Sequence, residues 1–185
     1  MITAADVLDF WFADGPGTPR AVWFQKNDSF DAACATFAPA HAAAKRGELD
    51  HWLETAEGGL ALLILLDQLS RNLHRGSAEA FAADERARAV AGSMVARGLD
   101  TALPPVQRMF VYLPFEHAED IVDQDRSVAL FETLRGLLSD STLDYAARHR
   151  DVIQRFGRFP HRNAVLGRTN TAAEVAFLAE PGSGF

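Results

Sequence analysis

The chain has 185 residues, of which 48% are hydrophobic and 23% are charged, and its formal net charge is −7. This composition is typical of a globular protein with a substantial core and excludes an intrinsically disordered chain. The acidic balance argues against nucleic-acid binding, because phosphate contacts require a basic surface. We therefore expect one domain over residues 1–185.

The sequence gives no sign of export or membrane insertion. Its first residues include Asp6 and Asp9 but no basic residue, so they lack the basic segment of a secretory signal. The longest apolar run, residues 60–66, is too short to span a bilayer. The single cysteine, Cys34, offers neither an intramolecular disulfide nor the spacing of a metal site. We expect a cytoplasmic protein that binds no metal or cofactor and contacts no membrane.

Helical periodicity dominates the N-terminal part of the chain. Thr3 is followed by Asp6, a pairing typical of a capping box, so a helix is expected to begin there. A second helix is expected from Asp28, with Pro39 bending or ending it, and a short one over residues 49–53.

The most apolar segment predicts a central buried helix. Gly58 and Gly59 open this segment, and residues 60–73 are hydrophobic nearly all round. Ser77 is expected to start a long helix that ends near Arg97, because Gly98 follows as a C-cap.

Four more helices are expected in the C-terminal part. One begins at Pro105 and is interrupted by Pro114, and two amphipathic helices cover residues 120–138 and 142–156. Thr171 caps the last one, with Glu174 in the position that completes a capping box. No segment has a convincing strand pattern, so the predicted fold class is all-α, an array of antiparallel helix pairs.

Polar residues interrupt the end of the buried helix. Asp67 and Arg71 are spaced i,i+4 and can form an ion pair, and Gln68 and Asn72 add two amides. One interpretation is a structural pair that locks the helix end to its neighbour, since a buried ion pair must be well hydrogen-bonded. The other is a cleft lined by an arginine and two amides, and we treat all four residues as candidate ligand-binding residues.

A second polar segment follows the helix that ends near residue 156. Arg158, His161, Arg162 and Asn163 occur within six residues of a loop that Pro160 keeps out of helix. Guanidinium groups suit the bidentate recognition of carboxylate or phosphate. The alternative interpretation is a structural loop whose arginines cap helix ends.

The third polar segment surrounds a predicted helix break. Glu116 and His117 lie beside Glu119 and Asp120, and a histidine with an adjacent carboxylate is a candidate for general acid–base catalysis. A helix-capping acidic cluster is the alternative, and the spacing matches no zinc signature. His149 lies on an expected buried face and is interpreted as a core histidine.

Charge is distributed unevenly along the C-terminal half. Residues 116–144 contain eight acidic residues and two arginines, whereas residues 145–170 contain six arginines and one acid. This pattern predicts pairing between an acidic and a basic helix, and it is also compatible with a local anion site.

Several motifs resemble a bacterial family known as domain of unknown function 924. They are DFWF from Asp9, WF at Trp23, LLDQLSRN ending at Asn72, LPFEH ending at His117 and RFGRFPHRN ending at Asn163. Ser70 departs from the proline that the family's pattern would place in the DQ-x-PRN run. The resemblance implies a tetratricopeptide-like helical-repeat fold and carries no established activity.

Two functions remain as hypotheses. The first is an enzyme or binder of a small anionic metabolite, with Arg71, Arg158 and Arg162 as anion clamps, Asn72 and Asn163 as orienting amides, and His117 or His161 as the proton carrier with Glu116 as its partner. The second is a helical-repeat module that binds a peptide or protein in a groove. A third interpretation gives the polar motifs a purely structural role.

Overall fold

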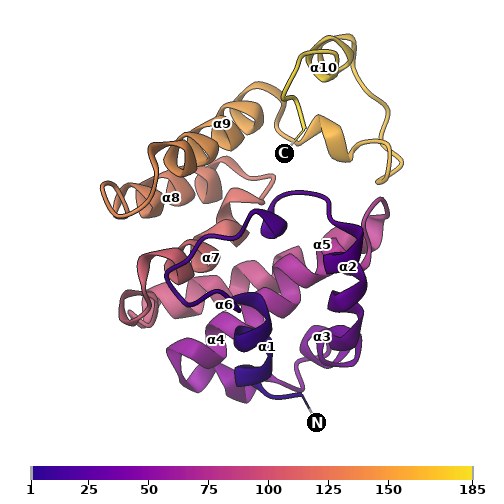
Figure 1. Ribbon diagram of the computed structural model, residues 1–185. Coiled ribbons are helices and arrows are strands. Elements are labelled where there is room, and N and C mark those ends of the chain that lie inside the picture. The colour runs from indigo at the N-terminus through magenta and orange to yellow at the C-terminus, as the bar shows by residue number, and fades with distance from the viewer. Residues whose placement is uncertain (1, 185) are drawn as a thin grey trace.

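The computed structural model describes residues 2–184, which form helices and connecting turns (Figure 1), with no β-strand within that range. The α-helices are α1 (Ala4–Trp11), α2 (Asp28–Cys34), α3 (Ala38–Lys45), α4 (Ala56–Leu63), α5 (Ser70–Leu73), α6 (Asp84–Ala96), α7 (Pro105–Glu116), α8 (Ile121–Glu132), α9 (Asp140–Phe156) and α10 (Ala172–Leu178). Short 3₁₀ turns occur at Ala21–Trp23, Ala35–Phe37, Asp50–Glu54, Ala78–Phe81, Asp100–Ala102 and Pro160–Arg162.

From α6 to α9, helices that follow one another in the sequence pack side by side. Helix α6 contacts α7, α7 contacts α8, and α8 contacts α9, and the predicted all-α fold class is confirmed. In Figure 1, α8 and α9 lie above the group formed by α1 to α7, and α10 lies beside them at the C-terminal end. The extended segment between α1 and α2 crosses the space between these two layers.

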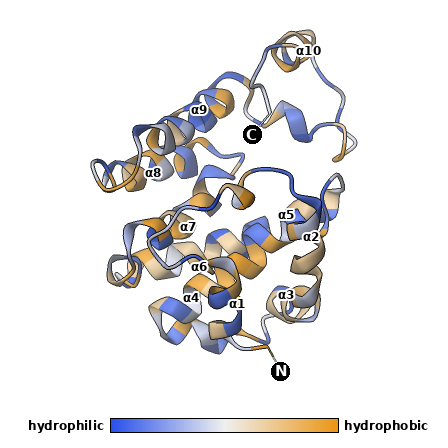
Figure 2. Cartoon of the chain, in the orientation of Figure 1, coloured by the Kyte–Doolittle hydropathy of each residue, from blue (hydrophilic) through white to orange (hydrophobic). Residues whose placement is uncertain are grey.

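The main hydrophobic core lies in the lower layer. It includes every residue of 60–66, all of them at most 1% exposed, together with the inward faces of α1, α6 and α7. Figure 2 shows hydrophobic residues concentrated along these helices. A second, smaller cluster joins Val152, Ile153 and Phe159, with Phe156 and Phe177 packed against it. Phe159 therefore anchors the loop that follows α9 to that helix, and Phe177 brings α10 against the same cluster.

Both predicted capping boxes are present. The Thr3 hydroxyl accepts a hydrogen bond from the amide of Asp6, and the Asp6 carboxylate accepts one from the Thr3 amide. Thr171 and Glu174 form the same reciprocal pair at the start of α10. These boxes satisfy amide groups that a helix N-terminus otherwise leaves without partners.

The central helix contains a π-helical turn. Helix α4 begins at Ala56, so Gly58 and Gly59 lie inside it, and at Gly58 the Trp52 carbonyl oxygen leaves no room for a Cβ. Residues Ile64–Leu69 then adopt π-helical geometry before α5 continues in the same direction. Such a turn is rare and often occurs at functional sites, since the extra residue redirects the side chains around it. Asp67 and Gln68 belong to this turn.

Three predicted helix boundaries are wrong. Pro114 does not interrupt its helix, because α7 continues to Glu116; the burial of nearly every side chain of α7 offsets the hydrogen bond that proline removes. Pro39 lies in the first turn of α3, where its missing amide hydrogen has no cost. The helix expected from Ser77 begins only at Asp84, after a 3₁₀ turn that ends at Phe81.

No helix within residues 2–184 combines the length and the apolar character needed to cross a lipid bilayer.

Candidate functional site

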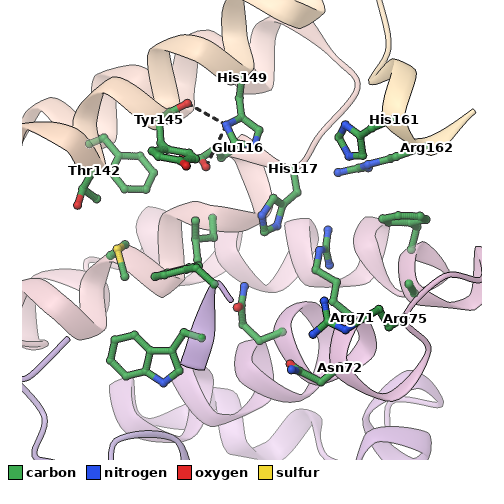
Figure 3. Close-up of a pocket in the computed structure, with 18 of the residues that line it drawn as sticks. Arg71, Asn72, Arg75, Glu116, His117, Thr142, Tyr145, His149, His161 and Arg162 are labelled. Carbon is green, nitrogen blue, oxygen red and sulfur yellow. Dashed lines mark hydrogen bonds and ion pairs between the residues drawn. The ribbon is translucent and has the colours of Figure 1, made fainter. Parts of the chain in front are cut away.

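A cavity of about 480 Å³ lies between the two layers of the fold. Its walls come from the turn before α2, the C-terminal end of the central helix, and helices α7, α8 and α9 with the loop that follows α9 (Figure 3). Residues that line it include Trp23, Phe24, Gln68, Arg71, Asn72, Arg75, Phe81, Met109, Leu113, Glu116, His117, Phe131, Tyr145, His149, His161 and Arg162. The three polar segments of the sequence therefore meet in one place.

Five charged or ionisable groups form a continuous chain along one wall. His117 contacts Asp67 at 2.8 Å, Asp67 contacts Arg71 at 3.1 Å, Arg71 contacts Asp84 at 3.0 Å, and Asp84 contacts Arg162 at 3.4 Å. We call this set the charge chain. Two carboxylates alternate with two guanidinium groups, so the chain is electrically balanced when His117 is neutral.

Asp67 is the most deeply buried member of the charge chain. Its side chain is 1% exposed, and it accepts hydrogen bonds from the amide of Gln68 and from Nδ1 of His117. Burial opposes its ionisation, but Arg71 and His117 outweigh burial and hold the pKa of Asp67 below its usual range. The pairing of Asp67 with Arg71 on one helix face, expected from their spacing, is confirmed. Asp67 therefore carries a fixed negative charge behind the cavity wall.

This charge orients His117. Because Nδ1 faces the Asp67 carboxylate, Nδ1 carries the ring hydrogen and donates it, which leaves Nε2 as the proton-accepting atom on the other side of the ring. Burial and the nearby Arg71 lower the pKa of His117, although Asp67 opposes this effect. His117 is thus a neutral imidazole near pH 7, and an Asp–His pair of this kind is the usual arrangement of a general base.

Glu116 contacts a different histidine from the one expected. Its Oε1 lies 3.3 Å from Nδ1 of His149, and that same nitrogen donates to the carbonyl of Tyr145 at 2.8 Å. Burial, followed by the negative charge of Asp67, raises the pKa of Glu116 to about 8, so this carboxyl holds its proton at neutral pH. Burial lowers the pKa of His149 to about 3. The partner of His117 is Asp67, and Glu116 supplies a neutral carboxyl to the cavity wall.

Arg162 is the least neutralised cation of the charge chain. Arg71 engages both oxygens of Asp84, whereas Arg162 has one contact with it. The Arg162 side chain is only 7% exposed, and its Nε–H makes no hydrogen bond within residues 2–184. Its guanidinium group lies over the ring of Phe81 and over that of Phe159, at 4.5 and 4.6 Å from the ring centroids. Burial, and then repulsion from Arg71, lower the pKa of Arg162 to about 10.

The neighbouring polar groups on this wall already have protein partners. Asn72 and Arg75 both bind the carboxylate of Asp31, Asn72 at 2.7 Å and Arg75 at 2.9 Å. The ring of His161 lies beside Arg162 in Figure 3, and burial, together with the charge of Arg162, lowers the pKa of His161 to about 4. His161 is therefore a neutral group and not the cation of the site.

The opposite end of the cavity is apolar and is called here the aromatic end. It is formed by Trp23, Phe24, Met109, Leu113, Phe131 and Tyr145. The indole N–H of Trp23 donates to the carbonyl of Trp11 at 2.9 Å, which fixes the ring, and Trp23 packs edge-on against Phe110. Phe24 and Tyr145 remain 62% and 48% exposed, so their rings form part of the cavity's solvent-facing rim.

Two candidate residues lie away from the cavity. Arg158 binds both oxygens of Glu174, at 2.6 and 2.8 Å, and so ties the loop to the start of α10. Asn163 donates to Asn170 at 2.7 Å within the same loop. For these two residues the structure favours the alternative interpretation, a structural role in holding the loop.

Three residues at the site were not predicted as functional residues from the sequence patterns. Asp84 and Phe81 lie in a stretch that was expected to be a regular helix, and His149 was interpreted as a core histidine. His149 is buried as expected, yet it also lines the cavity. The acidic and basic halves of the C-terminal region do pair, through Asp125 with Arg150 and through Glu119 with Arg168.

Within residues 2–184 no group of three or more histidine, cysteine, aspartate or glutamate side chains is arranged to hold a metal ion.

Comparisons with known proteins agree with the motifs. A search of curated proteins finds no match. The chain is similar to a solved structure described as a protein of unknown function, ATU0120, from Agrobacterium tumefaciens. The two share 46% identity over 95% of this chain and 96% of the other, with a TM-score of 0.87. Residues 7–182 match the family described as bacterial protein of unknown function (DUF924), and the chain belongs to that family.

Proposed function

We propose that the protein binds a small anionic metabolite in the cavity, with Arg162 as the anion contact and His117 as a proton carrier beside it. The single observation that carries this proposal is the charge chain, which joins a buried, under-neutralised guanidinium to an oriented histidine within one cavity. A carboxylate or phosphate group would accept hydrogen bonds from the part of the Arg162 guanidinium that lines the cavity.

A catalytic role is supported by the two ionisable groups at the centre of the cavity. His117 has a lowered pKa and presents an imidazole that can accept a proton, while Glu116 has a raised pKa and retains a proton that it can donate. Pairs of groups whose environments drive their pKa values apart are typical of acid–base catalysis. The reaction class we propose is a proton transfer to or from a substrate held by its anionic group.

The size and form of the site favour a small ligand over a peptide. The charged side chains of the charge chain are 1–21% exposed, so they are reached through the cavity and are not spread over an open groove. A volume of about 480 Å³ falls in the range of ordinary small-molecule sites.

A thermal-shift screen of the purified protein tests the proposal. The ligands are acetate, benzoate, inorganic phosphate and phenyl phosphate, with benzamide as the neutral comparison. Binding to the native state raises the unfolding midpoint by mass action, so a shift is expected for at least one acid and not for benzamide.

Two arginines four positions apart provide a matched pair of variants. Arg162→Met is expected to abolish the ligand-dependent shift, and Arg158→Met, which removes the pair with Glu174 outside the cavity, is expected to retain it. If none of these acids shifts the midpoint, or if both variants respond as the wild type does, the proposal is wrong.

A further inference from the structure

The cavity has two chemically different ends with the reactive groups between them. Figure 3 shows Tyr145 and Thr142 on one side, Glu116 and His117 in the middle, and Arg71, Arg75 and Arg162 on the other side. The aromatic end and the cationic end are therefore separated along the length of the cavity, and a ligand that contacts both must extend past His117.

The aromatic end is built to accept an apolar group. Met109, Leu113 and Phe131 are buried at 7%, 5% and 1% exposure, and they form its floor. Trp23 is held by its hydrogen bond to Trp11, so its ring is a rigid part of the wall.

The two rim residues leave apolar surface in water. Phe24 stacks on Phe110, with the ring planes 7° apart, yet it is among the most exposed large hydrophobic residues of the described chain. Tyr145 is about half exposed on α9 and lines the same cavity as Phe24. Covering apolar surface of this kind is favourable by roughly 25 cal/mol per Å².

We infer that the ligand is an amphipathic acid, with one carboxylate or phosphate at Arg162 and an apolar body about the size of one ring between Trp23, Phe24 and Tyr145. This inference rests on the proposed function and narrows the substrate class. It also places the bonds between the ligand's anionic group and its apolar body beside Nε2 of His117 and the carboxyl of Glu116. A plain inorganic anion would fill only one end of the cavity.

A series of acids with one head group and a growing body tests the inference by calorimetry. Acetate, benzoate and 3-phenylpropionate are compared, with 3-phenylpropanol as the analogue that lacks the charge. Affinity is expected to rise along the series by about fourfold for each buried methylene equivalent, and the alcohol is expected to bind far more weakly than its acid.

Substitutions of the two rim residues separate the contribution of the ligand's apolar body to affinity from that of its anionic group. Phe24→Ala and Tyr145→Ala are expected to weaken 3-phenylpropionate binding by about fivefold and to leave acetate binding unchanged, since aromatic contacts of this kind contribute modestly. Val122→Ala removes a similarly exposed apolar side chain outside the cavity and is the control.

The two proposals fail in distinguishable ways. Equal binding of acetate and 3-phenylpropionate, or an unchanged ratio of their affinities in both rim variants, would overturn the amphipathic ligand while leaving the anion site intact. The absence of binding by every acid would overturn the proposed function and this inference together.

Discussion

His117 donates its Nδ1 hydrogen to Asp67 across 2.8 Å, although 50 residues separate the two in sequence. The contact joins the C-cap residue of α7 to the π-helical turn of the central helix. From Asp67 the charge chain continues through Arg71 and Asp84 to Arg162, so the protonation of His117 and the charge of a ligand at Arg162 act on the same set of groups. This coupling leads to several measurable consequences.

Anion binding is expected to depend on the protonation of His117. The charge chain is balanced while His117 is neutral, and protonation makes it net positive, which favours an anion. Affinity for benzoate should therefore fall as the pH rises from 5 to 8, by up to about tenfold per pH unit where one proton is taken up on binding. Calorimetry in buffers with different ionisation enthalpies measures how many protons are taken up, because the observed binding enthalpy changes with the buffer in proportion to that number.

Two variants assign this proton to a residue. His117→Gln should remove most of the pH dependence of benzoate binding. Glu116→Gln should remove only a part near pH 8, where the native carboxyl loses its proton. If the pH profile of the His117→Gln variant equals that of the wild type, His117 is not the coupled group.

Replacing Asp67 should cost more stability than replacing Asp31, although each aspartate pairs with an arginine. Asp67→Asn removes the carboxylate that faces both Arg71 and His117, so one carboxylate, Asp84, is left among two buried guanidinium groups, and we expect a loss of about 3–5 kcal/mol in the free energy of unfolding. The Arg75 partner of Asp31 is 42% exposed, so Asp31→Asn should cost about 1 kcal/mol or less. Urea denaturation of both variants tests the difference, and equal losses would show that Asp67 is not a buried charged centre.

Glu116→Gln should stabilise the protein increasingly at higher pH. The carboxyl has a pKa of about 8 in the native state and its ordinary value of 4.5 when unfolded. Between these values the native state holds a proton that the unfolded state has released, so wild-type stability falls with rising pH by up to about 1.4 kcal/mol per unit from this group. Glutamine has nearly the same shape as the protonated Glu116 side chain, but it does not titrate. Unfolding free energies of both proteins at pH 5 and pH 8 should diverge, and a constant difference would contradict the assignment.

Two helical glycines should respond to alanine in opposite directions. A Cβ at Gly58 would lie 2.1 Å from the carbonyl oxygen of Trp52, so Gly58→Ala should lower stability by about 3 kcal/mol or prevent folding. At Gly92 in α6 the nearest atom would be 3.8 Å away, and Gly92→Ala should raise stability by about 0.5–1 kcal/mol. Thermal unfolding of both variants tests this packing of α4. An unchanged unfolding midpoint in Gly58→Ala would contradict the close approach of Gly58 to Trp52.

Local features of the fold could be predicted because neighbouring residues determine them. The capping boxes at Thr3 and Thr171 depend on side chains three residues apart, and both are confirmed. The errors at Pro114 and Ser77 have another origin. In both cases tertiary contacts decide the outcome: α7 is buried along its length, and Phe81 packs against the guanidinium groups of Arg71 and Arg162.

The candidate site could be predicted only in part for the same reason. The sequence identifies polar segments that look out of place, and Arg71, His117 and Arg162 do meet in one cavity. It cannot tell which of two arginines in one loop faces inward, so Arg158 and Arg162 looked alike although only Arg162 lines the cavity. Likewise, the pairing of His117 with Asp67 depends on how α7 crosses the central helix.

The most direct test of the anion site follows the arginine side chains by nitrogen–proton NMR during a titration with benzoate. The Nε–H signal of Arg162, assigned with the Arg162→Met variant, should shift and saturate, because an anion bound to this guanidinium changes the electric field at an N–H that makes no hydrogen bond within residues 2–184. The Nε–H signal of Arg158, which is bound to Glu174 at 2.6 Å, should stay in place. If the Arg162 signal does not move while benzoate binds, the anion does not contact Arg162 and the proposed site is wrong.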